Sequence, residues 1–355
     1  MKICSPQLGL APNSILGGEV YDREILKGLA RKGIKVEIIL PANAPYDHNV
    51  KNWNITNIHF KHFPAILFNI LIIPYLFFSY KRTKFDILRI HSPQFIGFAA
   101  VFFKLFFPRV KIIACYHQFR ESEMYGLGKF FNNFWDFIIT DSNYVKEKIL
   151  KKYNVLPAKI AAIHNGVPPY LKPQTVTKKQ GNVMVLMFMG LFIRRKNPLL
   201  LLKIIKKLND KKILLIFIGK GPLKENIINE AKKSDLLHQI KILDPVFGKE
   251  KLRLLSKADV FVHPAIDEGF PLAPLEAMAV AKPIIASKGW SAAEMVTDGV
   301  NGFIVSNEKE WISAIKKLKK KRNRDQMGKH SYQKIKKEFQ WDIAVKKHIE
   351  IFNKL

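Results

Sequence analysis

Glu268 and Glu276 are the most informative candidate site residues of this chain. The sequence predicts that the first lies in a loop and the second on the helix that follows. The apolar run 260–262 predicts a strand, and Pro274 suits the first turn of a helix, where a backbone N–H is unpaired anyway. We therefore expect Glu268 in the loop after a strand and Glu276 in the first helical turn. Free amides at the start of that helix would face an anion, with phosphate the natural candidate.

Predicted strands and helices alternate along the chain in two series. The polar stretch 174–182 follows Pro168-Pro169, has no apolar periodicity and reads as a linker between the series. Two such series predict an α/β protein with two Rossmann-like, doubly wound parallel-sheet domains that face a central cleft. The expected strands are 2–5, 36–40, 87–90, 111–115 and 137–140 in the first series, and 183–189, 213–218, 240–243, 260–262 and 284–286 in the second.

Candidate binding residues follow strands in both series. The carboxyl ends of parallel strands border the ligand crevice, so residues at these positions are expected to converge on it. Glycines there let the backbone approach a diphosphate or an acceptor closely, although a plain turn into a helix explains the first two equally well. The candidates are Gly17, Gly18, His117, Arg194, Arg195, Lys196, Gly219, Gly221 and Glu268.

The run 267–279, with its Glu-Gly-Phe-Pro and Glu-Ala-Met-Ala segments, resembles the signature of retaining glycosyltransferases of family four. These enzymes have the GT-B fold and use nucleotide-sugar donors. The resemblance implies that Glu268 contacts the donor sugar and that Glu276 holds the ribose. It also implies that the loop between them, Phe270, Pro271, Leu272 and Ala273, contacts the diphosphate. The alternative is a solvated loop followed by an ordinary helix start.

The segment 190–198 resembles the Gly-Arg…Lys diphosphate motif of the same family. It departs from that motif at Leu191, where the family has arginine, so Arg194 or Arg195 would supply the missing charge. Arg195 and Lys196 would stabilise the negative charge that builds on a departing nucleoside diphosphate. Surface cations in a basic chain are the other interpretation.

His117 matches the histidine that closes the corresponding strand in this family, near the donor sugar and the acceptor. It would hydrogen-bond the transferring sugar or orient the acceptor hydroxyl, although a histidine at a strand end is often structural. No Asp-x-Asp signature appears in the sequence. The cations named above would take the place of a divalent ion, so we expect a metal-independent reaction with no cofactor. A nucleotide diphosphate-sugar would be the co-substrate.

The expected domain organisation follows from the linker and the family fold. Residues 1–172 would form an acceptor-binding Rossmann-like domain, 173–182 a linker, and 183–335 a nucleotide-sugar-binding Rossmann-like domain. Residues 336–355 would form a helix that crosses back onto the first domain.

The formal net charge of +30 predicts a polyanionic partner. Nucleic acid is disfavoured, because the sequence has no RNP-like motif, zinc-finger spacing or recognition-helix pattern. The anionic inner face of a membrane is the other candidate. The run 63–80 is nearly as long as the roughly 18 apolar residues of a membrane span, but Pro74 would break it. Together with 95–107, this run predicts either helices whose outer faces lie on lipid or two buried core helices.

Cys4 and Cys115 lie in apolar, strand-like runs, which predicts buried free thiols and a reducing compartment. The first residues read as a strand rather than a signal peptide. The expected location is cytoplasmic, peripheral on the inner face of the membrane.

These observations predict a retaining, metal-independent glycosyltransferase with a glycan or lipid-linked acceptor at the cytoplasmic membrane face. One alternative is an inactive GT-B-like binding subunit at a membrane, which Leu191 favours. Another is a glycosidase with Glu268 and Glu276 as its catalytic pair, about 5–9 Å apart. The diphosphate-type cations count against the glycosidase.

Overall fold

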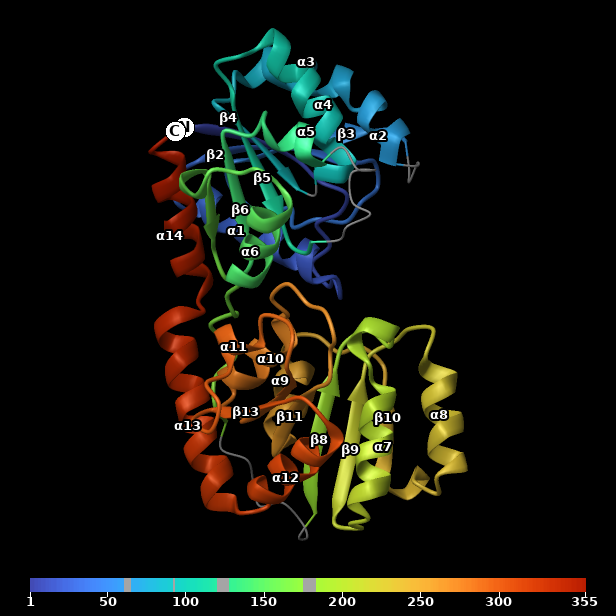
Figure 1. The fold of residues 1–355 in the computed structure, drawn as a ribbon. Coiled ribbons are helices and arrows are strands. Elements are labelled where there is room, and N and C mark those ends of the chain that lie inside the picture. Colours follow the sequence, from blue (N-terminus) through green and yellow to red (C-terminus); the bar gives the residue numbers. More distant parts are fainter. Residues whose placement is uncertain (61–64, 92, 120–127, 175–182) are drawn as a thin grey trace. The chain divides into compact units, whose positions relative to one another are not determined.

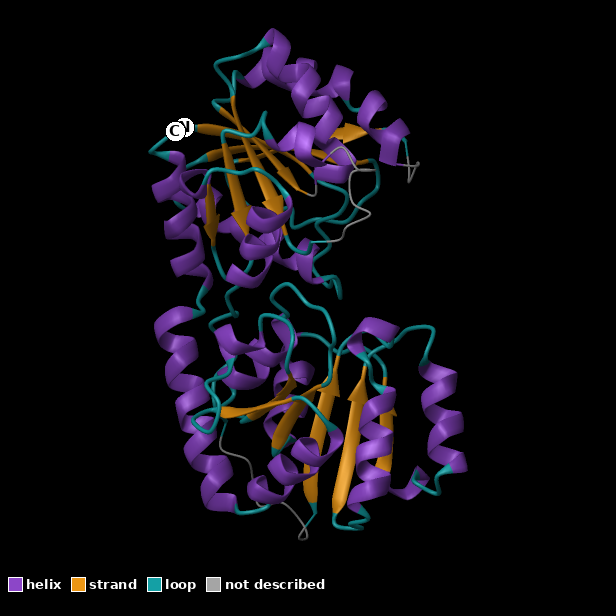
Figure 2. Ribbon diagram, viewed as in Figure 1, coloured by secondary structure: helices purple, strands orange, loops and turns teal. Residues whose placement is uncertain are grey.

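The computed structural model describes residues 1–60, 65–91, 93–119, 128–174 and 183–355 (Figure 1). The chain divides into a first unit, residues 1–165 with 341–355, and a second unit, residues 166–340. Each unit is a parallel sheet with helices on both faces (Figure 2). The predicted architecture of two Rossmann-like α/β domains is therefore confirmed.

The sheet of the first unit contains the five predicted strands and adds two others at its edges. The edge strand β3 alternates polar and apolar residues, and the opposite edge strand is only three residues long, so neither forms the apolar run that marks a buried strand. In spatial order the strands are β3 (Trp53–Ile58), β2 (Lys35–Pro41), β1 (Lys2–Pro6), β4 (Ile87–His91), β5 (Lys111–Tyr116), β6 (Phe137–Thr140) and β7 (Ile160–Ala162).

The sheet of the second unit repeats this order. In both sheets the order reverses beside the first strand, between β1 and β4 and between β8 and β11, and such switch points open a crevice at the carboxyl ends of the strands. In spatial order the strands are β10 (Ile240–Leu243), β9 (Ile213–Ile218), β8 (Met184–Met189), β11 (Val260–His263), β12 (Ile284–Ser287) and β13 (Gly302–Val305).

Helices connect most consecutive strands and bury the apolar faces of both sheets. Those of the first unit are α1 (Gly17–Arg31), α2 (Ala65–Leu71), α3 (Ile73–Thr83), α4 (Pro93–Phe106), α5 (Gly128–Asn132), α6 (Asn143–Lys152), the 3₁₀ turn η2 (Pro157–Lys159) and α14 (Trp341–Phe352). Those of the second unit are η3 (Arg194–Lys196), α7 (Leu199–Leu208), α8 (Lys224–Lys233), η4 (Leu237–Gln239), α9 (Gly248–Lys257), α10 (Leu272–Ala279), α11 (Ala292–Met295), α12 (Glu308–Leu318) and α13 (Lys321–Glu338).

The boundary between the units differs from the expected one. The backbone of Val167 pairs with that of Gln340, and its N–H donates to the carbonyl of Phe339 at 3.1 Å. Residues 166–172 and 336–340 therefore belong to the second unit, and the chain re-enters the first unit at Trp341. Of the expected linker, residues 175–182 lie outside the described residues.

Helix α14 packs on α1 within the first unit. An added Cβ at Gly28 would lie 2.2 Å from Cγ2 of Val345, so a glycine lets the two helices approach closely. His348 is fully buried between them, and its Nδ1 lies 2.8 Å from the carbonyl oxygen of Ala344. Nδ1 must donate to that carbonyl, so Nε2 accepts from the hydroxyl of Tyr21 at 3.1 Å. Burial lowers the pKa of His348 to about 3.

The apolar run 63–80 is divided between two helices, with residues 63 and 64 outside the described residues. The break falls at Ile72, and Pro74 lies in the first turn of α3, where a proline is tolerated. Phe68 and Leu76 are buried in the core, whereas Leu67, Ile70 and Phe78 are exposed. Among the described residues, no helix is long and apolar enough to cross a membrane.

Cys4 and Cys115 are both free and buried, as predicted. Burial raises the pKa of the Cys115 thiol to about 12. Such thiols pack as small apolar groups and are poor nucleophiles.

The depressed pKa of His348 makes the first unit less stable in acid. The native state keeps this imidazole neutral while the unfolded chain protonates it, so stability is complete above an unfolded pKa of about 6.5 and is lost as the pH falls below that value. Between pH 7 and pH 5 the loss is about 2 kcal/mol for this residue. We expect His348→Phe to reduce the pH dependence of the melting temperature over this range. The same substitution at the exposed His238 is the control, and equal effects of both changes would contradict the assignment.

Candidate active site

The switch point of the second unit brings together a carboxylate and two cations. Glu268 follows β11 and is only 5% exposed. Its Oε1 accepts from Nη1 of Arg195 at 2.7 Å and from Nζ of Lys196 at 2.8 Å. One carboxylate therefore meets two positive charges, and the surplus charge favours an anion at this place.

Lys196 is the more enclosed of the two cations, with a side chain 12% exposed. Burial lowers its pKa, and the neighbouring Glu268 partly offsets this effect. Arg195 and Lys196 come from η3, directly after β8, whereas the adjacent Arg194 is exposed. Of the two arginines considered for the diphosphate, the structure brings Arg195 to Glu268.

The predicted glycines after β9 hold two loops together. An added Cβ at Gly219 would lie 1.9 Å from the carbonyl oxygen of Gly190, and one at Gly221 would lie 2.6 Å from that of Phe192. The N–H of Phe192 donates to the carbonyl of Lys220 at 2.9 Å. Gly219 and Gly221 thus keep the loop after β9 against the loop that carries Arg195 and Lys196.

The loop after Glu268 leads into α10. Phe270 is buried, with its ring 5.5 Å from that of Phe339, and Pro271 is the residue before the helix. Proline has no side-chain acceptor, so the first amides of α10, from Leu272 and Ala273, receive no cap from it.

Glu276 lies further along α10 than predicted. The helix begins at Leu272, two residues before Pro274, so Glu276 lies in the second turn and not in the first. Its Oε1 accepts from Nζ of Lys251 at 2.9 Å, and the carboxylate is buried. Lys251 belongs to α9 and was missed, because the charge-rich run around it gave no sign that one lysine points inward.

His263 was also missed. It is the last residue of β11, fully buried, with its ring 5.0 Å from that of Trp290. Burial, with Lys196 and Arg195 nearby, holds its pKa well below the usual range. The imidazole of His263 is therefore neutral and lies near Arg195 and Lys196. Its position at a strand end, like that of His117, was the available signal.

In the first unit, two histidines meet at the switch point. His117 follows β5 and His91 ends β4, and His117 Nε2 lies 3.1 Å from His91 Nδ1. An added Cβ at Gly18 would lie 3.2 Å from His91 Cε1 and 3.5 Å from His117 Cδ2, so a glycine lets α1 begin against both rings. An added Cβ at Gly17 would meet nothing within 4 Å in the described part of the chain.

Asp22 joins this pair from α1, one turn after Gly18. It is fully buried, forms an ion pair with Arg89 and contacts Nδ1 of His91, and its Oδ2 lies 3.7 Å from His117 Nε2. Although burial alone would raise the pKa of Asp22, Arg89 and His91 hold it well below its usual range. Burial lowers the pKa of His117, an effect that Asp22 partly offsets.

Asp22, Arg89 and His91 were not predicted as site residues. Asp22 lies on the otherwise apolar face of α1, and Arg89 interrupts an apolar strand. A charged residue in an apolar stripe is seldom buried without a partner, and this was the signal that could have found them.

Asp22, His91 and His117 have ligand atoms within 4.8 Å of one another, a spacing that could hold a metal ion. However, Arg89 is fully buried beside Asp22 and already balances its charge. A divalent cation would leave excess positive charge inside the unit, which is costly. We therefore interpret the cluster as a hydrogen-bonded network that orients the two imidazoles.

Comparison with known families identifies the whole arrangement. The family model described as Glycosyltransferase Family 4 matches residues 15–170, and the model described as Glycosyl transferases group 1 matches residues 173–334. The chain belongs to this glycosyltransferase family. The resemblance drawn from residues 267–279 is thus confirmed.

Individual relatives agree with the family. The O-antigen chain mannosyltransferase RfbU of Salmonella typhimurium is 33% identical over 181 residues, which cover 51% of this chain and 50% of RfbU. The match therefore spans about half the length of that relative.

Solved structures show the fold of this glycosyltransferase. Sucrose-phosphate synthase from Thermosynechococcus elongatus superposes with a TM-score of 0.85 at 16% identity, over 99% of this chain and 98% of the other. HepE from Anabaena, solved in complex with UDP, gives a TM-score of 0.82 at 16% identity over 100% of both chains. The predicted GT-B fold is confirmed.

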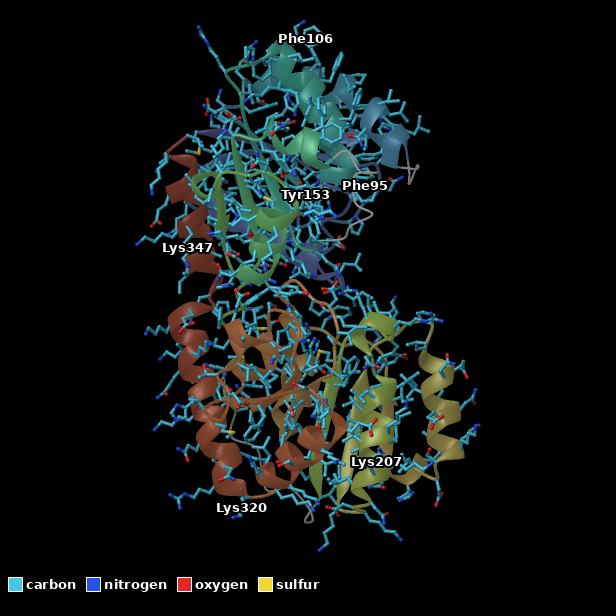
Figure 3. All side chains as sticks on the ribbon, viewed as in Figure 1. Phe95, Phe106, Tyr153, Lys207, Lys320 and Lys347 are labelled. Carbon is cyan, nitrogen blue, oxygen red and sulfur yellow. The ribbon has the colours of Figure 1, made fainter. Side chains whose placement is uncertain are left out.

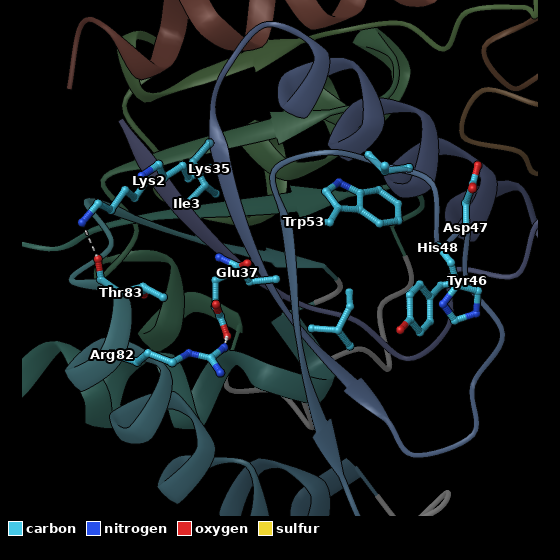
Figure 4. Close-up of a pocket in the computed structure, with 13 residues that line it drawn as sticks. Lys2, Ile3, Lys35, Glu37, Tyr46, Asp47, His48, Trp53, Arg82 and Thr83 are labelled. Atoms are coloured by element: carbon cyan, nitrogen blue, oxygen red, sulfur yellow. Dashed lines mark hydrogen bonds and ion pairs between the residues drawn. The ribbon is translucent and has the colours of Figure 1, made fainter.

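The first unit contains a cavity of about 640 Å³ whose lining is drawn in Figure 4 and includes neither His91 nor His117. Its lining includes Lys2, Lys35 and Trp53, the first residues of β1, β2 and β3, whereas the histidines lie at carboxyl ends of strands. The Glu37–Arg82 ion pair lies on its wall. The cavity contains none of the predicted site residues.

We expect Gly219→Ala to destabilise the second unit of this glycosyltransferase by about 1–3 kcal/mol, the usual cost of overpacking. The added methyl would collide with backbone rather than with a side chain that could move. Chemical denaturation measures the loss. Gly17→Ala, at an open position, is the matched control, and an unchanged stability of Gly219→Ala would show that the two loops do not need this close approach.

Proposed function

We propose that this protein is a retaining, metal-independent glycosyltransferase. It moves a sugar from a nucleotide diphosphate-sugar to a glycan or lipid-linked acceptor at the cytoplasmic face of the membrane. The observation that carries the proposal is the contact of Arg195 and Lys196 with Glu268 at the carboxyl ends of β8 and β11. Family membership supports the class of reaction, and the UDP complex of HepE supports a nucleotide donor.

The donor diphosphate would lie between the cation pair and the start of α10. Arg195 and Lys196 supply positive charge, and the uncapped amides of Leu272 and Ala273 supply hydrogen-bond donors. Glu276 would accept from the ribose hydroxyls. Its partner Lys251 keeps the carboxylate in place before the nucleotide arrives.

The transfer step exchanges one C–O bond for another. The bond between the anomeric carbon and the diphosphate oxygen breaks, and its electron pair leaves with the phosphate. The acceptor hydroxyl attacks the same face of the sugar and passes its proton to the departing phosphate oxygen. Arg195 and Lys196 stabilise the charge that develops there, and one such cation contributes about 10²–10³ in rate.

His117 would contact the transferring sugar or orient the acceptor hydroxyl. Because burial lowers its pKa, the neutral imidazole both donates and accepts a hydrogen bond, which suits a hydroxyl. Its Nε2 lies against His91 and Asp22, so these residues set which ring nitrogen remains for the sugar.

The arrangement disfavours the glycosidase. Glu268 is paired with Arg195 and Lys196, and Glu276 with Lys251, so each carboxylate has cations of its own. A glycosidase needs its two carboxyls to flank one scissile bond, with one of them protonated. The inactive-subunit alternative loses the support of Leu191, because Arg195 brings an arginine to the site.

Loss of the cation or the carboxylate should slow transfer strongly. We expect Lys196→Ala and Glu268→Gln to lower the rate by about 10²–10³, with circular dichroism unchanged. Lys212→Ala, at the amino end of β9, is the matched control and should retain wild-type activity. Full transfer by either site variant would refute the assignment of this cluster.

EDTA should leave the rate unchanged, because side-chain cations take the place of a divalent ion. Proton NMR of the product gives its anomeric configuration, which should equal that of the donor. Loss of activity in EDTA that Mg²⁺ restores would disprove metal independence, and an inverted product would disprove retention.

A further inference from the structure

Helices α2, α3 and α4 of the first unit present large apolar side chains to solvent. Leu105, Phe106 and Phe78 are 68%, 57% and 58% exposed. Phe106 lies at the outer end of the helix layer (Figure 3). We call this surface the aromatic helix face, formed by Leu67, Ile70, Phe78, Phe98, Leu105 and Phe106.

The side chains of the aromatic helix face belong to one packed layer. Helix α4 contacts both α2 and α3. The half-buried ring of Phe77 lies 5.4 Å from the ring of Phe106, and that of Phe102 lies 5.2 Å from it. The exposed ring of Phe106 on α4 therefore packs against a ring of the neighbouring helix α3. Contiguous apolar surfaces of this kind mark interaction sites.

The charge around this face is mainly positive. Asp86 is the only acidic residue in the sequence between His48 and Arg120. Exposed Lys81, Arg82 and Lys84 follow Phe78 at the end of α3, and Arg109 follows the end of α4. These two helix ends lie together, because the rings of Tyr80 and Phe107 are 4.2 Å apart.

We propose that the aromatic helix face docks onto a lipid bilayer with anionic head groups. Exposed aromatic and aliphatic side chains beside lysine and arginine match the boundary between acyl chains and head groups. The inference deepens the proposed function, on which it rests for the membrane-held acceptor, and it names the surface that makes the contact.

Other occupants fit less well. A second copy of this chain would place Lys81, Lys84 and Arg109 against the same cations, because a two-fold interface repeats one patch on both sides. Nucleic acid would meet the cations but would leave Phe106 and Leu105 against charged phosphates. A bilayer matches both the apolar and the positive groups.

The docking face and the histidine pair share a helix. Helix α4 begins at Pro93, two residues after His91, and carries Phe98, Leu105 and Phe106 along its length. A bilayer on this face would therefore hold a lipid-linked acceptor near the unit that carries His117.

Vesicle co-sedimentation tests the proposal without any donor sugar. The full-length protein is mixed with vesicles of phosphatidylcholine alone or of phosphatidylcholine with phosphatidylglycerol. We expect binding to the anionic vesicles that weakens as salt rises. Leu105→Ser/Phe106→Ser should lower the affinity at least ten-fold, and Lys81→Ala and Lys84→Ala about five-fold each. Leu237→Ser, at an exposed leucine of the second unit, is the matched control.

Three outcomes would overturn the docking face. These are no binding to anionic vesicles, equal binding by Leu105→Ser/Phe106→Ser, or a dimer in solution that this variant abolishes. Lys196→Ala should bind vesicles like the wild type, because it alters only the proposed transfer site. Vesicle binding by Leu105→Ser/Phe106→Ser therefore tests docking, and sugar transfer by Lys196→Ala tests the proposed function independently.

Discussion

The buried contact of Glu268 with Arg195 and Lys196 is the constraint on which the second unit's site depends. It joins the loop after β8 to the loop after β11 on the two sides of the switch point. Removing Glu268 would leave both cations without a counter-charge, and a buried charge left unpaired in this way costs about 3–5 kcal/mol. The carboxylate thus holds two cations in place before any phosphate arrives, and such preorganisation gives electrostatic catalysis its strength.

The first unit repeats this construction with different residues. Asp22 is buried against Arg89 and reaches His91 and His117 at the ends of β4 and β5. In both units a buried carboxylate contacts proposed site residues at the carboxyl ends of strands at or near the switch point. The shared sheet order explains this, because it opens a crevice at the same place in each sheet.

The ten strands predicted from the sequence agree with the structure to within about a residue, because parallel strands of this kind are short apolar runs. The sequence did not predict β3, in which polar and apolar residues alternate, or β7, which has only three residues, because neither gives that signal. It also did not predict β13, although the run 303–305 after Gly302 is apolar. Glu268 and Lys196 were proposed as site residues from the family motifs and from their positions after strands. The Glu268–Lys196 and Glu276–Lys251 contacts join residues far apart in the chain. Hydrophobic periodicity gives no information about such pairs. The unit boundary was misplaced for the same reason, because it depends on the pairing of Val167 with Gln340.

The central claim is that Arg195, Glu268 and Lys196 together form the binding site for the diphosphate of a nucleotide. Thermal shift with UDP, GDP and ADP in EDTA tests it directly, because a ligand that binds the native state raises the melting temperature. The account predicts a shift with one of these nucleotides, retained in Lys212→Ala and lost in Lys196→Ala. A folded wild type that responds to none of them, or a Lys196→Ala variant that responds like the wild type, would contradict it.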